Sequence, residues 1–129
     1  MHRSSLNKPK SILVVDDNGI NRLLPGLILR PFGWTVYEAS GGLEALKTIK
    51  DTEISCVLLD ISMPDISGLE VLKALRKKPE LQNVKIFAYT GYSQQKDVNH
   101  LLNLGFDAVI IKPLTSIKLL TVLQTALFY

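Results

Sequence analysis

The eight residues SILVVDDN, Ser11–Asn18, carry the clearest indication of how this chain folds. Their first part is a continuous apolar run, which is typical of a strand buried on both faces of a sheet. Two carboxylates, Asp16 and Asp17, follow the run directly, and Asn18 is a residue type that often begins a helix as its N-cap. The segment therefore predicts a buried strand with an acidic end, followed by a helix over about residues 19–30.

Four further strand-like runs, each followed by a helical pattern, continue this arrangement along the chain. The expected strands are Trp34–Ala39, which alternates like an edge strand, and Cys56–Leu59, Val84–Tyr89 and Asp107–Ile111. The expected helices begin at Ser40, Ser67, about residue 93 and Thr115. Five alternating strand–helix units predict one α/β domain over residues 11–129, with a five-stranded parallel sheet, right-handed crossovers and helices on both faces.

Local signals add detail to three of these helices. Pro25 and Gly26 fall in the middle of the first helix, where proline removes a backbone hydrogen bond and predicts a kink. Ser40 is the expected N-cap of the second helix. Ser67, with Glu70 three residues later, predicts a capping box at the start of the third.

The bulk composition is that of an ordinary one-domain globular chain. The 129 residues are 47% hydrophobic and 21% charged, and no apolar stretch is long enough to cross a membrane. Cys56 is the only cysteine, so no internal disulfide can form and a cytoplasmic location is expected. Residues 1–10 are polar and basic and are expected to form a flexible tail or linker.

The net charge of +3 is scattered along the chain. The densest basic run, Arg76-Lys77-Lys78, closes a predicted helix, where cations interact favourably with the helix dipole. No aromatic-rich basic stripe accompanies it. Direct binding to nucleic acid is therefore not expected, nor is direct binding to a membrane.

Five polar residues stand where the expected strands or their turns end. They are Asp16, Asp17, Asp60, Thr90 and Lys112. Because the carboxyl ends of parallel strands meet at one edge of a sheet, these side chains should share one site. Three neighbouring carboxylates repel one another unless a cation or protons neutralise them, and oxygen ligands suit Mg²⁺ or Mn²⁺. A carboxylate nucleophile, a divalent cation, a lysine and a hydroxyl are a sufficient set for accepting a phosphoryl group.

Four sequence segments resemble those of response-regulator receiver domains of two-component phosphorelays. They are Ile12–Asn18, Leu58–Gly68, Tyr89–Tyr92 and Ile111–Leu114, and the resemblance covers about residues 10–128. It implies the flavodoxin-like strand order 2-1-3-4-5. It also implies a phosphoryl donor that is a histidine kinase or a histidine phosphotransfer domain. Such a domain is not an enzyme beyond its own phosphoryl transfer and autodephosphorylation.

The resemblance assigns a role to each acidic residue of the site. Asp60 would be the phospho-accepting carboxylate. Asp17 and Asp60 would bind Mg²⁺ directly, Asp16 would act mainly through water, and the backbone carbonyl of Ser62 would supply another oxygen.

The remaining roles implied by the resemblance concern the last two strand ends. Thr90 would be the switch hydroxyl, and Lys112 the lysine that pairs with Asp60 and later with a phosphoryl oxygen. The Lys112-Pro113 peptide bond would be cis.

Finer sequence features resemble the receivers of hybrid histidine kinases, while one position departs from the family pattern. The likeness lies in Asp17-Asn18 with Asn21-Arg22, in Thr90-Gly91-Tyr92 and in Gly105–Ala108. The departure is Val109, where many receivers carry an aromatic residue three positions before the lysine. Tyr89 or Tyr92 are the residues that could substitute for it.

The last expected helix is apolar over a wide arc, at Leu119, Leu120, Val122, Leu123, Ala126 and Leu127. Either this helix is deeply buried, or it contributes a homodimer or partner face.

Two other functions are compatible with the sequence. One is a phosphorylation-independent, receiver-like interaction or dimerisation module, which Val109 favours. The other is a Mg²⁺-dependent phosphate-ester hydrolase. Such enzymes typically have a second acidic residue two positions after the nucleophile, where this chain has Ser62.

Overall fold

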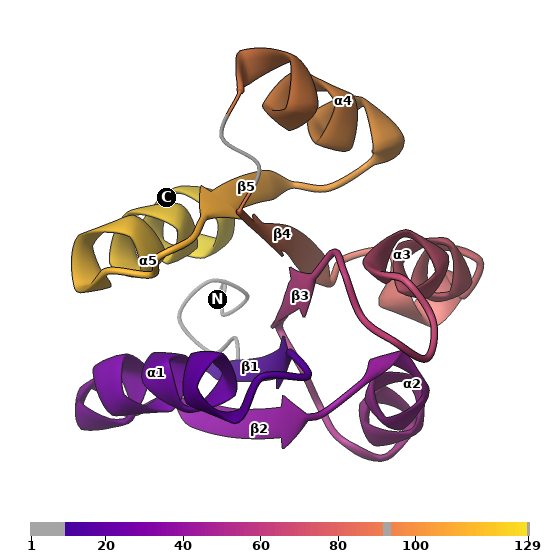
Figure 1. Ribbon diagram of the computed structural model, residues 1–129. Coiled ribbons are helices and arrows are strands. Elements are labelled where there is room, and N and C mark those ends of the chain that lie inside the picture. Colours follow the sequence, from indigo (N-terminus) through magenta and orange to yellow (C-terminus); the bar gives the residue numbers. More distant parts are fainter. Residues whose placement is uncertain (1–9, 92–93, 129) are drawn as a thin grey trace.

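Five parallel strands form one sheet at the centre of the computed structural model, which describes residues 10–91 and 94–128 (Figure 1). The strands are β1 (Ser11–Val15), β2 (Thr35–Ala39), β3 (Cys56–Asp60), β4 (Lys85–Thr90) and β5 (Ala108–Ile111). Their order across the sheet is β2-β1-β3-β4-β5, and every neighbouring pair is parallel. The α/β class and the strand order expected from the sequence are both confirmed.

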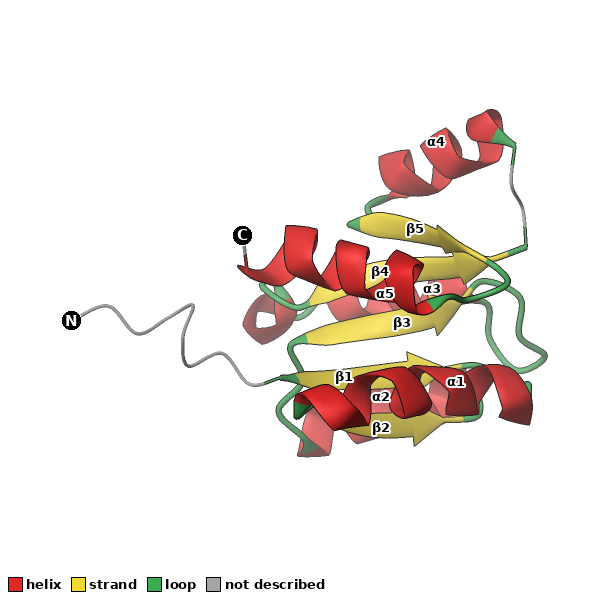
Figure 2. Ribbon diagram, turned by 90° about the vertical axis from the view of Figure 1, so that its left-hand side faces the viewer, coloured by secondary structure: helices red, strands yellow, loops and turns green. Residues whose placement is uncertain are grey.

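The helices lie on both faces of this sheet, as expected. They are α1 (Gly19–Leu29), α2 (Gly42–Asp51), α3 (Gly68–Arg76), α4 (Gln95–Leu104) and α5 (Ser116–Leu123), which continues into a π-helical turn at Gln124–Phe128. Helices α1 and α5 cover one face, and α2 and α3 cover the other (Figure 2). Among the described residues, no helix has the length and apolar character needed to cross a bilayer.

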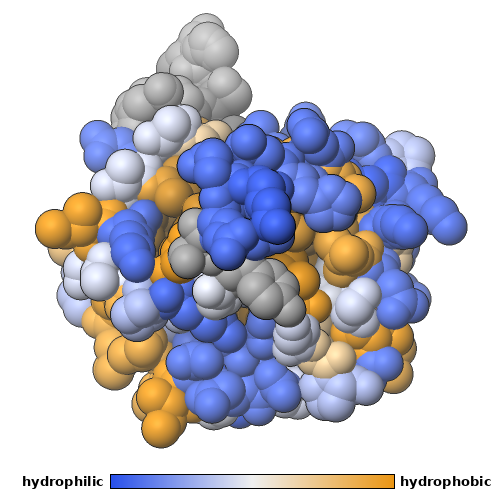
Figure 3. Space-filling view, turned by 45° about the horizontal axis from the view of Figure 1, so that its top comes forward, coloured by the Kyte–Doolittle hydropathy of each residue, from blue (hydrophilic) through white to orange (hydrophobic). Residues whose placement is uncertain are grey.

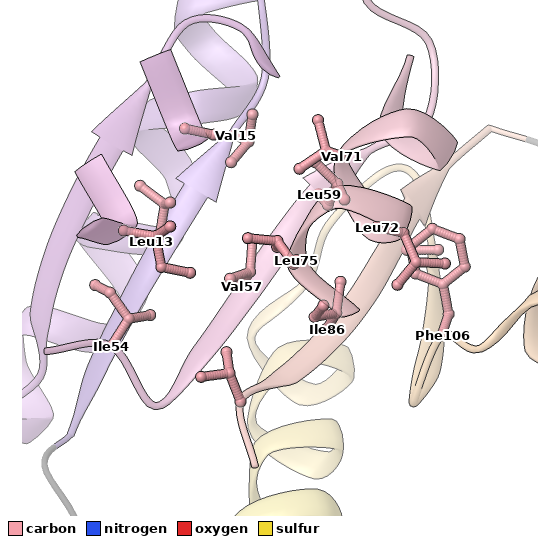
Figure 4. Close-up of a cluster of buried hydrophobic side chains, with 14 of the residues drawn as sticks. Leu13, Val15, Ile54, Val57, Leu59, Val71, Leu72, Leu75, Ile86 and Phe106 are labelled. Carbon is pink, nitrogen blue, oxygen red and sulfur yellow. The ribbon is translucent and has the colours of Figure 1, made fainter. Parts of the chain in front are cut away.

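Each face of the sheet has its own hydrophobic cluster. Every residue of β1 and β3 is buried, which explains why their sequences are continuous apolar runs rather than alternating ones. On the α2/α3 side, the α3 residues Val71, Leu72 and Leu75 pack over Val57 and Leu59 (Figure 4). Leu101 of α4 joins this cluster, whereas α1 and α5 pack against the cluster on the other face. The thiol of Cys56 is buried in that second cluster, as its apolar neighbours suggested.

Helix α1 is one continuous element that contains Pro25, and the kink expected at this residue stays a prediction. At the glycine that follows, a Cβ would meet the guanidinium group at the end of the flexible Arg30 side chain, which would have to move. That guanidinium donates a 3.1 Å hydrogen bond from Nη2 to the carbonyl of Val36, on the edge strand β2. Gly26 thus leaves room for an arginine side chain that donates to a backbone carbonyl of the edge strand.

Two of the three expected N-caps are confirmed. The side chain of Asn18 accepts hydrogen bonds from the backbone at the start of α1, and Ser67 forms the capping box with Glu70. The cap expected at Ser40 is wrong. The N-cap of α2 is Gly41, which has no side chain to offer, and a carboxylate from a distant loop takes its place.

Candidate functional site

The carboxyl ends of β1, β3, β4 and β5 surround an open pocket of about 440 Å³. All five strand-end residues singled out in the sequence reach it. The pocket is lined by Asp16, Asp17, Asn18, Asn21, Asp60, Ser62, Thr90, Gly91 and Lys112. It lies where the strand order reverses around β1, the position at which sheets of this type bind ligands.

Three carboxylates form the acidic part of the pocket. Val15 pairs with Leu59 in the β1–β3 register, so the next residues, Asp16 and Asp60, are neighbours at the ends of adjacent strands. Both are buried, whereas Asp17 is exposed at the pocket opening. One oxygen from each of the three carboxylates lies within 4.8 Å of the others.

Lys112 follows directly after β5, on the other side of β4 from Asp60, and its ammonium adds a positive charge to the acidic cluster. Its Nζ lies 3.4 Å from Oδ2 of Asp16 and 3.5 Å from Oδ1 of Asp60. The pairing with Asp60 expected from the sequence is therefore present, and Asp16 is a second partner. The Lys112-Pro113 peptide bond is cis, as the resemblance implied.

Thr90 and Ser62 complete the lining. Thr90 is the buried last residue of β4, and its backbone carbonyl accepts a 2.8 Å hydrogen bond from the N–H of Lys112. Ser62 follows Asp60 by two residues and donates a 3.2 Å hydrogen bond from its backbone N–H to Oδ1 of Asp60. This bond fixes the orientation of the Asp60 carboxylate within the pocket.

The loop between β1 and α1 is held in place by Arg22, which in the sequence is notable only as part of the likeness to hybrid-kinase receivers. Its Nη1 donates a 2.9 Å hydrogen bond to the carbonyl of Asp16, and its Nε lies 3.3 Å from a carboxylate oxygen of Glu38. Oδ1 of Asp16 in turn accepts a 2.9 Å bond from the N–H of Asn18. These contacts fix both the backbone and the side chain of Asp16.

The loop between β3 and α3 is held in place by Asp65, for which no sequence pattern indicates a role. Its carboxylate accepts hydrogen bonds from the N–H groups of Gly42 (3.2 Å) and Leu43 (3.0 Å), at the start of α2. The bond from Leu43 contributes most to holding the pKa of Asp65 below its ordinary value. At the end of the loop, a Cβ on Gly68 would lie 2.5 Å from the carbonyl oxygen of Asp60, so only glycine fits there.

The pKa of Asp60 is raised from its ordinary value of 3.8 to about 6. Burial is the main cause, because it disfavours the charged form, and the neighbouring charge of Asp16 adds to it. Lys112 and the N–H of Ser62 act in the opposite direction without cancelling the effect. The ionised site is therefore an electrostatically costly arrangement that a bound cation would relieve.

This cost predicts that Asp60→Asn stabilises the protein at neutral pH in the absence of divalent cations. Between pH 4 and 6 the folded protein binds more protons than the unfolded chain, so the contribution of Asp60 to stability falls as the pH rises through this range. Above pH 6 the penalty is complete. Removing the carboxylate should then raise the free energy of unfolding by about 1–3 kcal/mol.

Urea unfolding in EDTA at pH 7.5 and at pH 4 measures this effect. The gain of Asp60→Asn over the wild-type protein should nearly vanish at pH 4, and the exposed control Asp51→Asn should show no comparable gain at either pH. A variant no more stable than the wild type at pH 7.5 would contradict the electrostatic description of the site.

The donor set fits a divalent cation. Among the side chains that the structure describes, Oδ2 of Asp16 is a buried oxygen without a hydrogen-bond partner; Lys112 Nζ, 3.4 Å away, is an ion-pair partner only. The carboxylate of Asp16 belongs to the three-carboxylate cluster. Buried polar atoms are rarely left unsatisfied, and hard oxygen ligands are those that Mg²⁺ and Mn²⁺ prefer. The residues present could therefore hold such an ion.

Fold and site together define a class: a flavodoxin-like α/β domain with an acidic, cation-type site at its switch point. Comparison with known families agrees with this description. The family model for the response regulator receiver domain matches residues 12–124. The chain belongs to the response regulator receiver domain family.

Relatives and solved structures support this assignment. The chain is 33% identical over 107 residues to the polar-differentiation response regulator DivK of Brucella anthropi, covering 83% of this chain and 87% of that protein. It superimposes on the chemotaxis response regulator CheY4 of Vibrio cholerae with a TM-score of 0.85 and 26% identity, covering 92% and 99% of the two chains.

A second similar structure is the receiver domain of the sensor histidine kinase PA1611 from Pseudomonas aeruginosa. It has a TM-score of 0.82 and 25% identity, covers 92% of this chain and 98% of that one, and contains a magnesium ion coordinated in its active-site cleft. Relatives thus include both a response regulator and a receiver of a histidine kinase. The attachment of this chain to a hybrid kinase remains a prediction.

Proposed function

We propose that this receiver domain accepts a phosphoryl group on Asp60 from a phospho-histidine donor, with Mg²⁺ as cofactor and Mn²⁺ as a substitute. The observation that carries the proposal is the convergence of three carboxylates and the Lys112 ammonium in one pocket. The donor would be a histidine kinase or a histidine phosphotransfer domain. A cytoplasmic location is part of the proposal and is supported by the free thiol of Cys56.

The transfer would exchange one bond to phosphorus for another. A carboxylate oxygen of ionised Asp60 forms a bond to phosphorus while the P–N bond to the donor histidine breaks. The electron pair of that bond stays with the leaving imidazole, which takes up a proton. The domain would react once per phosphoryl group and later lose it to water, so it would not be a turnover enzyme.

Asp16, Asp17 and the backbone carbonyl of Ser62, together with Asp60, are the oxygen donors that would hold the cation. When bound, it would supply positive charge to the phosphoryl oxygens during transfer. Lys112 is placed to neutralise a further phosphoryl oxygen, and the hydroxyl of Thr90 to donate a hydrogen bond to another.

The exposed residues of α1 suit a docking surface for the donor. Ile20, Leu23 and Leu27 are 74%, 49% and 64% exposed and recur at helical spacing, and Asn21 on the same helix lines the pocket. An apolar stripe on a helix beside the site matches the helix-packing mode of recognition. The molecular face in Figure 3 is mostly hydrophilic, with its exposed hydrophobic residues in separate small patches.

The homodimer face expected near the last helix remains a prediction. The six apolar residues that suggested it are buried or half-buried against the core, so the core accounts for them. The surface left for a dimer contact is an apolar groove of about 380 Å³. Its lining residues include Ile111, Val122 and Ile117, which is 78% exposed. A monomeric mass by light scattering at high protein concentration would exclude such a dimer.

Intact-mass spectrometry after incubation with acetyl phosphate tests the phosphoryl-acceptor proposal. We expect one added phosphoryl group with Mg²⁺, almost none in EDTA, and none on Asp60→Asn under either condition. If neither acetyl phosphate nor a phospho-histidine donor domain labels the wild-type protein, the interaction-module alternative replaces this proposal. Sustained turnover of a phosphate ester would instead favour the hydrolase.

A further inference from the structure

The ring of Tyr89 lies under the path that Lys112 takes to the acidic site. In the sheet, β4 separates β3 from β5, and Tyr89 pairs with Asp60 on one side and with Ile110 on the other. Lys112 follows directly after β5, whose Ile110 faces the same side of the sheet as Tyr89. To reach Asp60, the lysine side chain must therefore cross β4 above Tyr89.

The distances from the Lys112 ammonium agree with a side chain that passes above the Tyr89 ring. The Nζ of Lys112 lies 4.8 Å from the centroid of the Tyr89 ring, within the range in which a cation is attracted by an aromatic face. The same Nζ is 3.4 Å and 3.5 Å from the carboxylates of Asp16 and Asp60. The ammonium is thus held between two carboxylates and a ring.

The ring itself is fixed by its surroundings. Tyr89 is only 1% exposed and belongs to the core cluster that also contains Ile110 and Leu114. Burial and the charge of Asp16 raise the pKa of Tyr89, with the backbone N–H of Leu114 acting in the opposite direction, so the phenol stays neutral. A rigid, neutral ring offers Lys112 a constant contact surface that a flexible aliphatic side chain would not.

We propose that Tyr89 is a positioning residue that holds the Lys112 ammonium over the carboxylates of Asp16 and Asp60. This inference deepens the phosphoryl-acceptor proposal and rests on it for its functional meaning. Because Tyr89 shares its core cluster with Leu114, just before α5, it links the site lysine to the start of the last helix. Val109, which lacks an aromatic ring, is not needed for this connection. Tyr92, the other candidate substitute for that ring, lies outside the described residues.

Two variants distinguish the effect of the aromatic face from the effect of the volume that the side chain fills. Tyr89→Leu keeps an apolar side chain but removes the aromatic face, whereas Tyr89→Phe keeps the face and removes the hydroxyl. At saturating Mg²⁺, the leucine variant should take up the phosphoryl group about 2- to 30-fold more slowly, a range that follows from cation–π energies. The phenylalanine variant should recover most of the lost rate.

NMR of lysine side chains tests the placement without any phosphorylation. The ring current of an aromatic side chain shifts the NMR signals of protons above its face upfield. The ε-CH₂ signals of Lys112, which lies above the Tyr89 ring, should therefore be shifted upfield. We expect this shift in the wild-type and Tyr89→Phe proteins, its loss in Tyr89→Leu, and no change in Tyr37→Leu, which removes a half-buried tyrosine of β2. An unshifted Lys112 signal in the wild type, or an unchanged signal and rate in Tyr89→Leu, would overturn the inference. Absence of phosphorylation would leave the NMR test intact.

Discussion

The Asp17→Ala protein should bind Mg²⁺ at least about 100-fold more weakly than the wild-type protein. Asp17 is the exposed member of the three-carboxylate cluster, and its loss removes one negative oxygen donor from a site that Asp16 and Asp60 alone cannot complete. Changing a residue that only supports a metal ligand costs about 10–100-fold in affinity, so loss of a direct ligand should reach the top of that range or exceed it.

Thermal or urea unfolding with and without Mg²⁺ measures this effect. At a Mg²⁺ concentration about 100 times the wild-type dissociation constant, the wild-type protein should gain about 2.7 kcal/mol, and the variant well under 1 kcal/mol. Asp51→Ala removes an exposed carboxylate at the end of α2 and should respond like the wild type. A full Mg²⁺ response in Asp17→Ala would show that the acidic cluster is not the cation site.

The Lys112→Met protein should still bind Mg²⁺ but accept a phosphoryl group about 10²–10³-fold more slowly. Its ammonium lies within 3.5 Å of both buried carboxylates, which is where negative charge gathers as the phosphoryl group arrives. Removing one preorganised charge partner from a transition state typically costs a rate factor of this size. Mg²⁺ affinity should not fall, because the variant loses a cation that competes for the same carboxylates.

Two measurements on the same variant distinguish these effects. A time course of intact mass at saturating Mg²⁺ gives the rate of uptake, and the Mg²⁺ dependence of stability gives the affinity. Lys47→Met makes the same change of charge on the exposed surface of α2 and should alter neither quantity. Equal losses of Mg²⁺ binding and of uptake in Lys112→Met would mean that the lysine holds the site together rather than taking part in transfer.

The parts of the fold that local sequence determines could be predicted. The buried strands β1 and β3 are continuous apolar runs, since both of their faces are covered. Asn18 and Ser67 cap the helices that directly follow them, so their contacts lie within a few residues. The site was predictable for a related reason: parallel strands place their carboxyl ends side by side whatever the details of packing.

The features that the sequence did not indicate depend on contacts between distant segments. The cap of α2 comes from Asp65, more than twenty residues further along the chain, so Ser40 was the better local candidate and was nonetheless wrong. The contact of Tyr89 with Lys112 depends on the registers of two strand pairs at once. No spacing along the sequence reports either of these contacts.

The most direct test of the central claim is to locate the phosphoryl group chemically. The wild-type protein is labelled with acetyl phosphate and Mg²⁺, the acyl phosphate is reduced with borohydride, and the peptides are sequenced by mass spectrometry. We expect homoserine at position 60 alone, with Asp16 and Asp17 unmodified. Homoserine at either of those two positions, or unmodified aspartate at all three after labelling with a phospho-histidine donor, would contradict it.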